Sequence, residues 1–167
     1  MKKIIIIGAG AMGSAFGVPC VENKNDVTIV GTHLEYELID EIKSKSQIHP
    51  TLKTQLPKEI KFERFDKLQS LLSKSPDIII CGVSSIGIEW FVEQISKTYK
   101  KKLPLVLLTK GLSIFDGDLI TLSDKIKNIL KNNGHSEINI SAIKGPCLAV
   151  GLANKMRTGT VIANQDI

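Results

Sequence analysis

The chain has 167 residues, of which 43% are hydrophobic and 23% are charged. This is the composition of an ordinary soluble globular protein, and it excludes collagen-like, disordered and disulfide-scaffold chains. The length fits one domain, since domains span about 100–200 residues, and argues against an enzyme with separate cofactor and substrate domains. We therefore expect residues 1–167 to form a single domain.

The charge is modestly basic. The 22 Lys and Arg residues exceed the 17 Asp and Glu residues by five, and Arg occurs only at Arg64 and Arg157. Nucleic-acid binding usually needs a basic stripe with aromatic or base-reading side chains beside it. The chain has only five Phe, two Tyr and one Trp, which are scattered. We expect no nucleic-acid partner, and a basic surface that attracts small anionic ligands.

The cysteines and the N-terminus both favour the cytoplasm. Cys20, Cys81 and Cys147 are odd in number and form no CxxC pair, so neither a disulfide framework nor a metal site is expected. The uncharged stretch from Ile4 to Val21 imitates a signal peptide or a short membrane span. Its continuous apolar part is only four isoleucines long, and glycines interrupt the rest. We expect a cytoplasmic protein without a membrane span.

Short β-branched runs alternate with amphipathic stretches of helical length. In chain order, the predicted strands are Lys3–Ile7, Val27–Val30, Asp77–Val83, Leu103–Thr109, Ile138–Ile143 and Thr160–Ala163, with Ile60–Phe65 as a possible extra strand. The predicted helices are Ala11–Asn23, Glu35–Lys45, Phe65–Ser73, Ile86–Lys97 and Leu119–Asn132. Pro19 lies inside the first helix, so a kink or restart is expected there. The pattern predicts an α/β fold: a doubly wound, mostly parallel, Rossmann-like sheet with helices on both faces.

The first strand leads into a glycine motif. Gly8-Ala9-Gly10-Ala11-Met12-Gly13 matches GxGxxG between an apolar strand and a helix, which is the context that makes this motif informative. Gly8 permits the tight turn, Gly10 lets the backbone approach a pyrophosphate, and Gly13 allows close packing of helix on strand. The helix N-terminus supplies unpaired N–H groups and a partial positive charge. The motif predicts a dinucleotide site; a glycine turn without a ligand is the alternative.

The cofactor preference depends on the end of the second strand. An NAD site usually has Asp or Glu about 20 residues after the glycines. Here the strand ends in Val30-Gly31-Thr32-His33, and the first carboxylate is Glu35. Nothing at the strand end is expected to repel a 2′-phosphate, and Thr32 or His33 could bond one, although no Arg is present. The sequence mildly favours NADP and leaves NAD open.

Further segments fall at the ends of predicted strands, where open α/β sheets place their ligand sites. They are Gly31-Thr32, Gly82-Val83-Ser84-Ser85, Thr109-Lys110-Gly111 and Lys144-Gly145-Pro146-Cys147-Leu148-Ala149. Together with the glycine motif, their order and spacing resemble the N-terminal domain of NAD(P)-dependent glycerol-3-phosphate dehydrogenase. The resemblance spans essentially the whole chain.

The resemblance implies a reaction and a set of site residues. The reaction is reversible hydride transfer between the nicotinamide and C2 of sn-glycerol 3-phosphate, which gives dihydroxyacetone phosphate. By position, the residues that would contact the cofactor are Gly8, Gly10, Ala11, Met12, Gly13, Thr32, Lys110 and Ala149. Those that would contact the substrate are Lys110, Gly145 and Cys147. The ammonium of Lys110 would bond the substrate oxygen; a surface lysine at a strand end is the alternative.

Cys147 stands where the family commonly has a hydroxyl or small side chain. Its place before a predicted helix N-terminus could lower the thiol pKa, but no base lies near it in the sequence. We interpret it as a small side chain that leaves backbone N–H groups accessible. Cys81, inside an apolar strand, is expected in the core.

In the family, a helical C-terminal domain supplies the general acid/base and the groups that hold the substrate phosphate. The resemblance therefore implies no general acid/base within these 167 residues, and weak or no turnover without that domain. The domain could be supplied separately. A non-catalytic dinucleotide-binding or sensing module and the cofactor domain of a related enzyme, such as a ketopantoate reductase, remain as alternatives.

Overall fold

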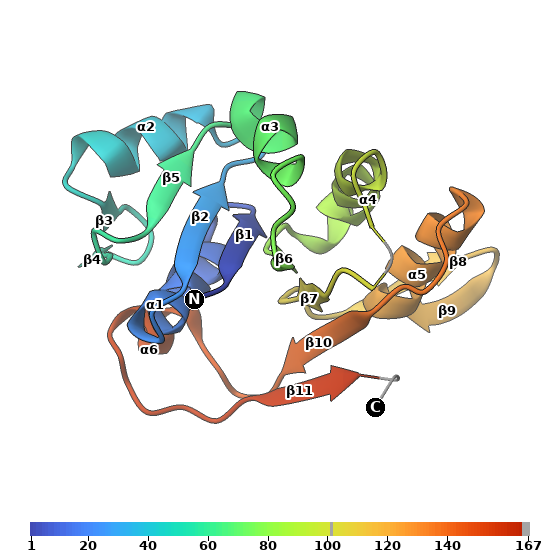
Figure 1. Ribbon diagram of the computed structural model, residues 1–167. Helices are drawn as coiled ribbons and strands as arrows, with labels where there is room; N and C mark the ends of the chain where they lie inside the picture. The colour runs from blue at the N-terminus through green and yellow to red at the C-terminus, as the bar shows by residue number, and fades with distance from the viewer. Residues whose placement is uncertain (101, 165–167) are drawn as a thin grey trace.

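The computed structural model describes residues 1–100 and 102–164 (Figure 1). Its strands are β1 (Lys3–Ile7), β2 (Asp26–Val30), β3 (Ile48–His49), β4 (Thr54–Gln55), β5 (Lys61–Glu63), β6 (Ile78–Cys81), β7 (Leu105–Leu107), β8 (Leu112–Phe115), β9 (Asp118–Thr121), β10 (Ile140–Lys144) and β11 (Val161–Asn164). Its helices are α1 (Ala11–Glu22), α2 (Tyr36–Ser44), α3 (Leu68–Leu72), α4 (Ile88–Ser96), α5 (Leu122–Asn132) and α6 (Ala149–Ala153), with 3-10 turns η1 (Phe65–Lys67) and η2 (Ser85–Gly87).

Seven strands form the main sheet, in the order β11-β10-β7-β6-β1-β2-β5. All neighbours are parallel except β11, which runs antiparallel to β10. From β1 the chain builds outward through β2 to β5, and then crosses to β6 on the other side of β1. The strand order therefore reverses between β1 and β6, and such a reversal is where doubly wound sheets bind ligands.

Each face of the sheet has its own hydrophobic core. In β1, alternate side chains point to opposite faces: Ile4 and Ile6 join the core that contains residues of α1 and α2, whereas Ile5 and Ile7 join the one that contains residues of α3, α4 and α5. Burial on both faces explains why the strand is apolar throughout, as parallel strands usually are. The expected α/β sheet with helices on both faces is confirmed.

The structure tests two local expectations, the extra strand within Ile60–Phe65 and the helix restart at Pro19. The ambiguous segment Ile60–Phe65 contains a short strand, β5, which extends the parallel sheet beside β2 with Lys61 opposite Thr28. The helix α1 runs without interruption through Pro19, so the expected restart is wrong. Proline removes one backbone donor, and packing of α1 on the sheet compensates for that single loss.

The expected start of the fifth helix at Leu119 is also wrong. Residues 118–121 form β9, which pairs antiparallel with β8 as a separate hairpin. At the turn, Asp116 and Gly117 have φ values of 50° and 89°, the left-handed backbone that an Asp-Gly hairpin turn requires. The helix α5 begins at Leu122, where the Thr121 hydroxyl caps it by accepting the N–H of Asp124 at 3.1 Å.

Candidate functional site

Residues 8–13, which we call the glycine turn, connect β1 to α1. They lie at the point where the strand order reverses between β1 and β6. Gly8 has φ +107°, and a Cβ on it would lie 2.7 Å from the carbonyl carbon of Gly82. A Cβ on Gly13 would lie 2.1 Å from the carbonyl oxygen of Gly8. Both positions exclude any side chain, because real Cβ contacts are never so short. Gly8 and Gly13 thus allow β1, β6 and α1 to meet closely.

Gly10 differs from the other two glycines. The nearest atom to a Cβ built on it is the Glu35 Oε1, at 3.8 Å, so the protein itself would accept a side chain there. Gly10 is also the N-cap of α1, without a capping side chain, and the first turn holds no acidic residue. The backbone N–H groups of Ala11, Met12 and Gly13 precede the first helical bond, from Ser14 N to Gly10 O. Open space beside free helical N–H groups fits a phosphate.

A cavity of about 480 Å³ opens beside the glycine turn. It is lined by Gly10, Ala11, Met12, Thr32, His33, Leu34, Glu35, Gly82, Val83, Ser84, Gly87 and Trp90. The His33 and Trp90 rings lie 5.1 Å apart, and Phe65 packs against Trp90 at 5.5 Å. The cavity thus combines a polar end at the helix N-terminus with a flat aromatic side that suits a base.

Three side chains fix the peptide groups of Ala9, inside the glycine turn. The Glu35 Oε2 accepts the Ala9 N–H at 3.0 Å, and the Ala9 carbonyl accepts the Ser14 hydroxyl at 2.8 Å. The same carbonyl pairs with the Nε2 of His49 at 3.0 Å. We refer to Glu35, Ser14 and His49 as the Ala9 cluster. It holds the turn in one geometry before any ligand arrives.

The tautomer of His49, which is fully buried, follows from its partners. Its Nδ1 accepts the backbone N–H groups of Thr51 and Leu52, at 3.2 and 3.3 Å, so that nitrogen has no proton. The Nε2 therefore has the proton and donates it to the Ala9 carbonyl. His49 could not be predicted from the sequence as a member of the Ala9 cluster, because its partner lies 40 residues away.

Glu35 corrects the expectation that no carboxylate lies at the end of β2. Its Oε2 also accepts the N–H of Thr32, at 2.7 Å, two residues past the end of the strand. The side chain folds back from the residue before α2 to the glycine turn. In the sequence, Glu35 lies five residues after Val30. A turn in which the Thr32 carbonyl accepts the Glu35 N–H at 3.0 Å brings its side chain back to the end of β2.

Lys110 lies at the same edge of the sheet, after β7. Its exposed Nζ donates to the carbonyl of Gly145 at 2.7 Å, and the Lys144 Nζ lies 3.4 Å from the carbonyl of Thr109. Two ammonium groups thus bridge the ends of β7 and β10 in opposite directions. The Thr109 hydroxyl donates to the Val83 carbonyl at 2.5 Å, which joins this pair to the loop after β6. The arrangement presents positive charge to an anionic ligand.

The remaining predicted site residues lie farther along that edge. Cys147 is only 5% exposed, and Ala149 begins α6, which packs against α1. Neither they nor Lys110 and Gly145 line the cavity of about 480 Å³. The structure thus brings Gly10, Ala11, Met12 and Thr32 around one cavity and leaves the predicted substrate residues beside it. Cys81 is in the core, as expected, and burial raises the pKa of its thiol to about 12.

A second cavity, of about 350 Å³, lies at the opposite edge of the sheet. Its lining includes Lys3, Asp26, Lys61, Glu63 and Lys74. Lys61 and Asp26 form an ion pair at 2.7 Å there. No glycine turn or helix N-terminus lines it, and parallel sheets place ligands at the other edge. Over residues 1–100 and 102–164, no group of His, Cys, Asp or Glu could hold a metal, and no helix could span a membrane.

The chain is similar to known glycerol-3-phosphate dehydrogenases. Residues 3–167 match the family model described as NAD-dependent glycerol-3-phosphate dehydrogenase N-terminus. The chain is 32% identical over 161 residues to the NADP(+)-dependent glycerol-3-phosphate dehydrogenase of Archaeoglobus fulgidus, with 96% of this chain and 46% of the relative covered. It is 30% identical to the glycerol-3-phosphate dehydrogenase [NAD(P)+] of Mesoplasma florum, with 99% and 48% covered.

Solved structures show the same fold. The glycerol-3-phosphate dehydrogenase of Coxiella burnetii superposes with a TM-score of 0.80 at 19% identity, over 99% of this chain and 47% of that one. The Plasmodium falciparum enzyme does so with a TM-score of 0.80 at 23% identity, over 99% and 46%. The chain spans about half the length of the curated relatives it matches. It belongs to the family of N-terminal, NAD(P)-binding domains of glycerol-3-phosphate dehydrogenases.

Proposed function

We propose that residues 1–167 form one dinucleotide-binding domain that holds the pyrophosphate of NAD(H) or NADP(H) on the glycine turn. The observation on which this rests is the contrast among the glycines. Gly8 and Gly13 have no room for a Cβ because protein atoms fill the space, whereas Gly10 has room that the protein leaves open. The open space lies over the N–H groups of Ala11 and Met12, which are available to a phosphate.

The adenosine half would lie along the aromatic side of the cavity. His33 and Trp90 offer flat surfaces for the base, and Thr32, which lines the same cavity, would lie near the ribose. The nicotinamide half would extend past Gly82 and Val83 toward the lysines after β7 and β10. Ala149, at the start of α6, is proposed as a further cofactor contact.

The substrate would be sn-glycerol 3-phosphate or dihydroxyacetone phosphate, bound beside Lys110, Gly145 and Cys147. A dinucleotide bound on the glycine turn would supply hydride-transfer chemistry at C2 of this substrate. The Lys110 ammonium, held by the Gly145 carbonyl at 2.7 Å, would hydrogen-bond the oxygen on C2 and stabilise negative charge there. Because Cys147 is buried, its contribution would come through the backbone of its loop rather than its thiol.

The reaction needs further groups, which the family resemblance assigns to a helical C-terminal domain. We propose that such a domain, in the same or a separate chain, provides the general acid/base and the phosphate contacts. Exposed apolar side chains on the β8–β9 hairpin support this, since Leu112, Ile114 and Leu119 are 58–69% exposed. We place the complete enzyme in the cytoplasm.

The substitution Gly10→Val tests the proposed function. It is expected to abolish NADH and NADPH binding, because the new side chain occupies the space over the phosphate-binding N–H groups, while the fold is retained. Fluorescence titration measures the affinity, and thermal melting verifies folding. Gly151→Val is the control, since a Cβ at Gly151 meets no atom within 4 Å and this residue does not line the cavity. Unchanged affinity in a folded Gly10→Val variant would remove the proposal.

A further inference from the structure

The floor of the second cavity is built by the register of three strands. Ile5 of β1 lies beside Thr28 of β2, and Thr28 lies beside Lys61 of β5. On either side of Thr28, Val27 and Ile29 belong to the core that contains residues of α1 and α2. Because successive side chains of a strand point to opposite faces, Thr28 points to the face that α3 covers, as Ile5 does. The cavity, of about 350 Å³, therefore lies on that face and shares no lining residue with the glycine turn.

Thr28 places a polar group in this floor. It is only 9% exposed, and its hydroxyl makes no hydrogen bond to any residue that the structure describes. Among those residues, the Gln47 Oε1 is the one unpaired side-chain atom that is sealed inside the protein, so the Thr28 hydroxyl reaches open space. That space is the cavity, which Thr28 lines. Since a buried hydroxyl without a partner costs free energy, a polar group bound there would supply the bond that the protein does not.

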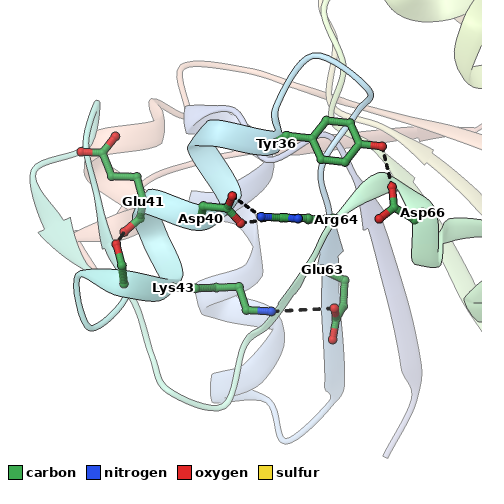
Figure 2. A network of polar contacts seen from close by, with 8 residues as sticks. Tyr36, Asp40, Glu41, Lys43, Glu63, Arg64 and Asp66 are labelled. Carbon is green, nitrogen blue, oxygen red and sulfur yellow. Dashed lines mark hydrogen bonds and ion pairs between the residues drawn. The ribbon is translucent and has the colours of Figure 1, made fainter.

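The two carboxylates that line the cavity are both neutralised by lysines. Asp26 of β2 accepts the Lys61 ammonium at 2.7 Å. Glu63 of β5 pairs with Lys43, on α2, at 3.9 Å, and Figure 2 shows the lysine side chain reaching from the helix to this carboxylate. Neither acid therefore leaves an uncompensated negative charge in the lining.

Two further lysines of the lining keep their charge available. The ammonium groups of Lys3 and Lys74 make no ion pair or hydrogen bond to any residue in the described part of the chain. Asp77 does not line the cavity, and its carboxylate already accepts the Lys3 N–H at 2.7 Å and pairs with Lys2 at 3.5 Å. The lining thus presents two positive charges to an anionic group.

Apolar side chains also line the cavity, since Ile5 is buried there and Leu71 of α3 is half-buried. The volume lies at the low end of the range for small-molecule sites, which is about 300–1,000 Å³. We propose that the second cavity binds a small organic anion, which combines a phosphate or carboxylate group with an apolar body. Lys3 and Lys74 bind the acid group, the body packs on Ile5 and Leu71, and the Thr28 hydroxyl hydrogen-bonds the ligand. This site is separate from the cavity proposed for the dinucleotide and does not depend on the proposed function.

Amide NMR of the wild-type chain tests the site with phenyl phosphate, which joins an anionic group to an apolar ring. Saturable chemical-shift changes are expected at Lys3, Thr28, Lys61 and Lys74. The affinity is expected to be at least about tenfold higher than for inorganic phosphate or benzyl alcohol, since each has only one of the two parts. Benzoate is titrated in the same way, and the tighter of the two aromatic ligands identifies the acid group as phosphate or carboxylate.

Three variants assign the binding to this lining. Lys74→Gln and Thr28→Val are each expected to weaken the tighter ligand about fivefold, the size of one ion pair or hydrogen bond. Lys131→Gln is the control, because it removes the same charge from an exposed position on α5 outside the cavity. Gly10→Val is expected to leave the changes at the second cavity intact, since Gly10 does not line it.

The outcomes that would overturn the site are distinct from those that bear on the dinucleotide. The absence of saturable changes at Lys3, Thr28, Lys61 and Lys74 with both aromatic ligands would overturn it. Benzyl alcohol or inorganic phosphate that binds as tightly as the aromatic anions would do the same, as would equal weakening by Lys74→Gln and Lys131→Gln. Failure of the folded chain to bind NADH would overturn the proposed function and leave these titrations unaffected.

Discussion

At the residue scale, the binding geometry depends on side chains that the glycine motif does not contain. Ala9 has no functional group, yet both of its peptide atoms are bonded by the Ala9 cluster. The motif could be predicted because its glycines are adjacent in sequence and each has a known steric role. Glu35 and His49 could not, because their partners lie 26 and 40 residues away and depend on tertiary packing.

His49 provides the residue-scale prediction. His49→Ala is expected to lower the free energy of unfolding by about 2–4 kcal/mol, because the N–H groups of Thr51 and the buried Leu52 lose their acceptor and a fully buried side chain is removed. Urea unfolding measures the loss. His135→Ala is the control, since His135 is only half-buried and packs edge-on against Tyr99. Equal losses in the two variants would show that the bonds to Ala9, Thr51 and Leu52 are not stabilising.

At the element scale, the hydrophobic pattern predicted the parallel strands and most helices. Burial on both faces makes a parallel strand a continuous run of apolar residues, and the helices show the helical period. The β8–β9 hairpin has no such signal. Its outward face is apolar and its pairing is local, so residues 119–121 are predicted as the start of the following helix and residues 112–115 are assigned to no element. The Asp116-Gly117 turn was the indication in the sequence, and its left-handed backbone is why the chain reverses there.

Asp77 joins the first residues of β1 and β6. The N–H of Lys3 donates to its carboxylate at 2.7 Å, and that bond, helped by the Lys2 ammonium at 3.5 Å, lowers the pKa of the Asp77 carboxyl. Because the pKa is lower in the folded state, the ionised carboxyl stabilises the fold at pH values above the unfolded pKa of about 3.9. This stabilisation is lost as the pH falls through the folded pKa.

Asp77→Asn is therefore expected to melt at a lower temperature than wild type at pH 7, and the difference is expected to close in acid below about pH 3.9. Thermal melting from pH 7 to pH 2.5 follows the difference. Asp118→Asn, which removes the same charge from an exposed strand position, is the control and should show no such pH dependence. A difference between wild type and Asp77→Asn that persists at the lowest pH would contradict the electrostatic explanation.

At the scale of the whole molecule, β1, β2, β6 and β7 run parallel, so the loops after β2, β6 and β7 lie at the same edge of the sheet, where the strand order reverses between β1 and β6. The proposed cofactor cavity at that edge is lined by residues of this chain. The proposed substrate end has two lysines and the loop that contains the buried Cys147, and the chain spans about half the length of the curated relatives it matches. Cofactor binding and catalysis are thus expected to be separable.

The purified chain is accordingly expected to bind NADH but to oxidise it with dihydroxyacetone phosphate at least several powers of ten more slowly than an ordinary dehydrogenase. Positioned proton transfer and a fixed substrate each contribute factors of that size. The absorbance of NADH at 340 nm follows the reaction. Turnover at ordinary enzyme rates by the 167-residue chain would show that its own residues complete the catalytic site.

The proposed function depends on where the dinucleotide binds, and amide NMR during an NADH titration reports this directly. The largest chemical-shift changes are predicted at Ala11, Met12 and Thr32, around the glycine turn. Binding at the second cavity, of about 350 Å³, would instead change the shifts of its own lining residues. If the chemical-shift changes centre on Lys3, Lys61 and Lys74, and the amide resonances of the glycine turn do not shift, the dinucleotide does not bind at the glycine turn and the proposed function is wrong.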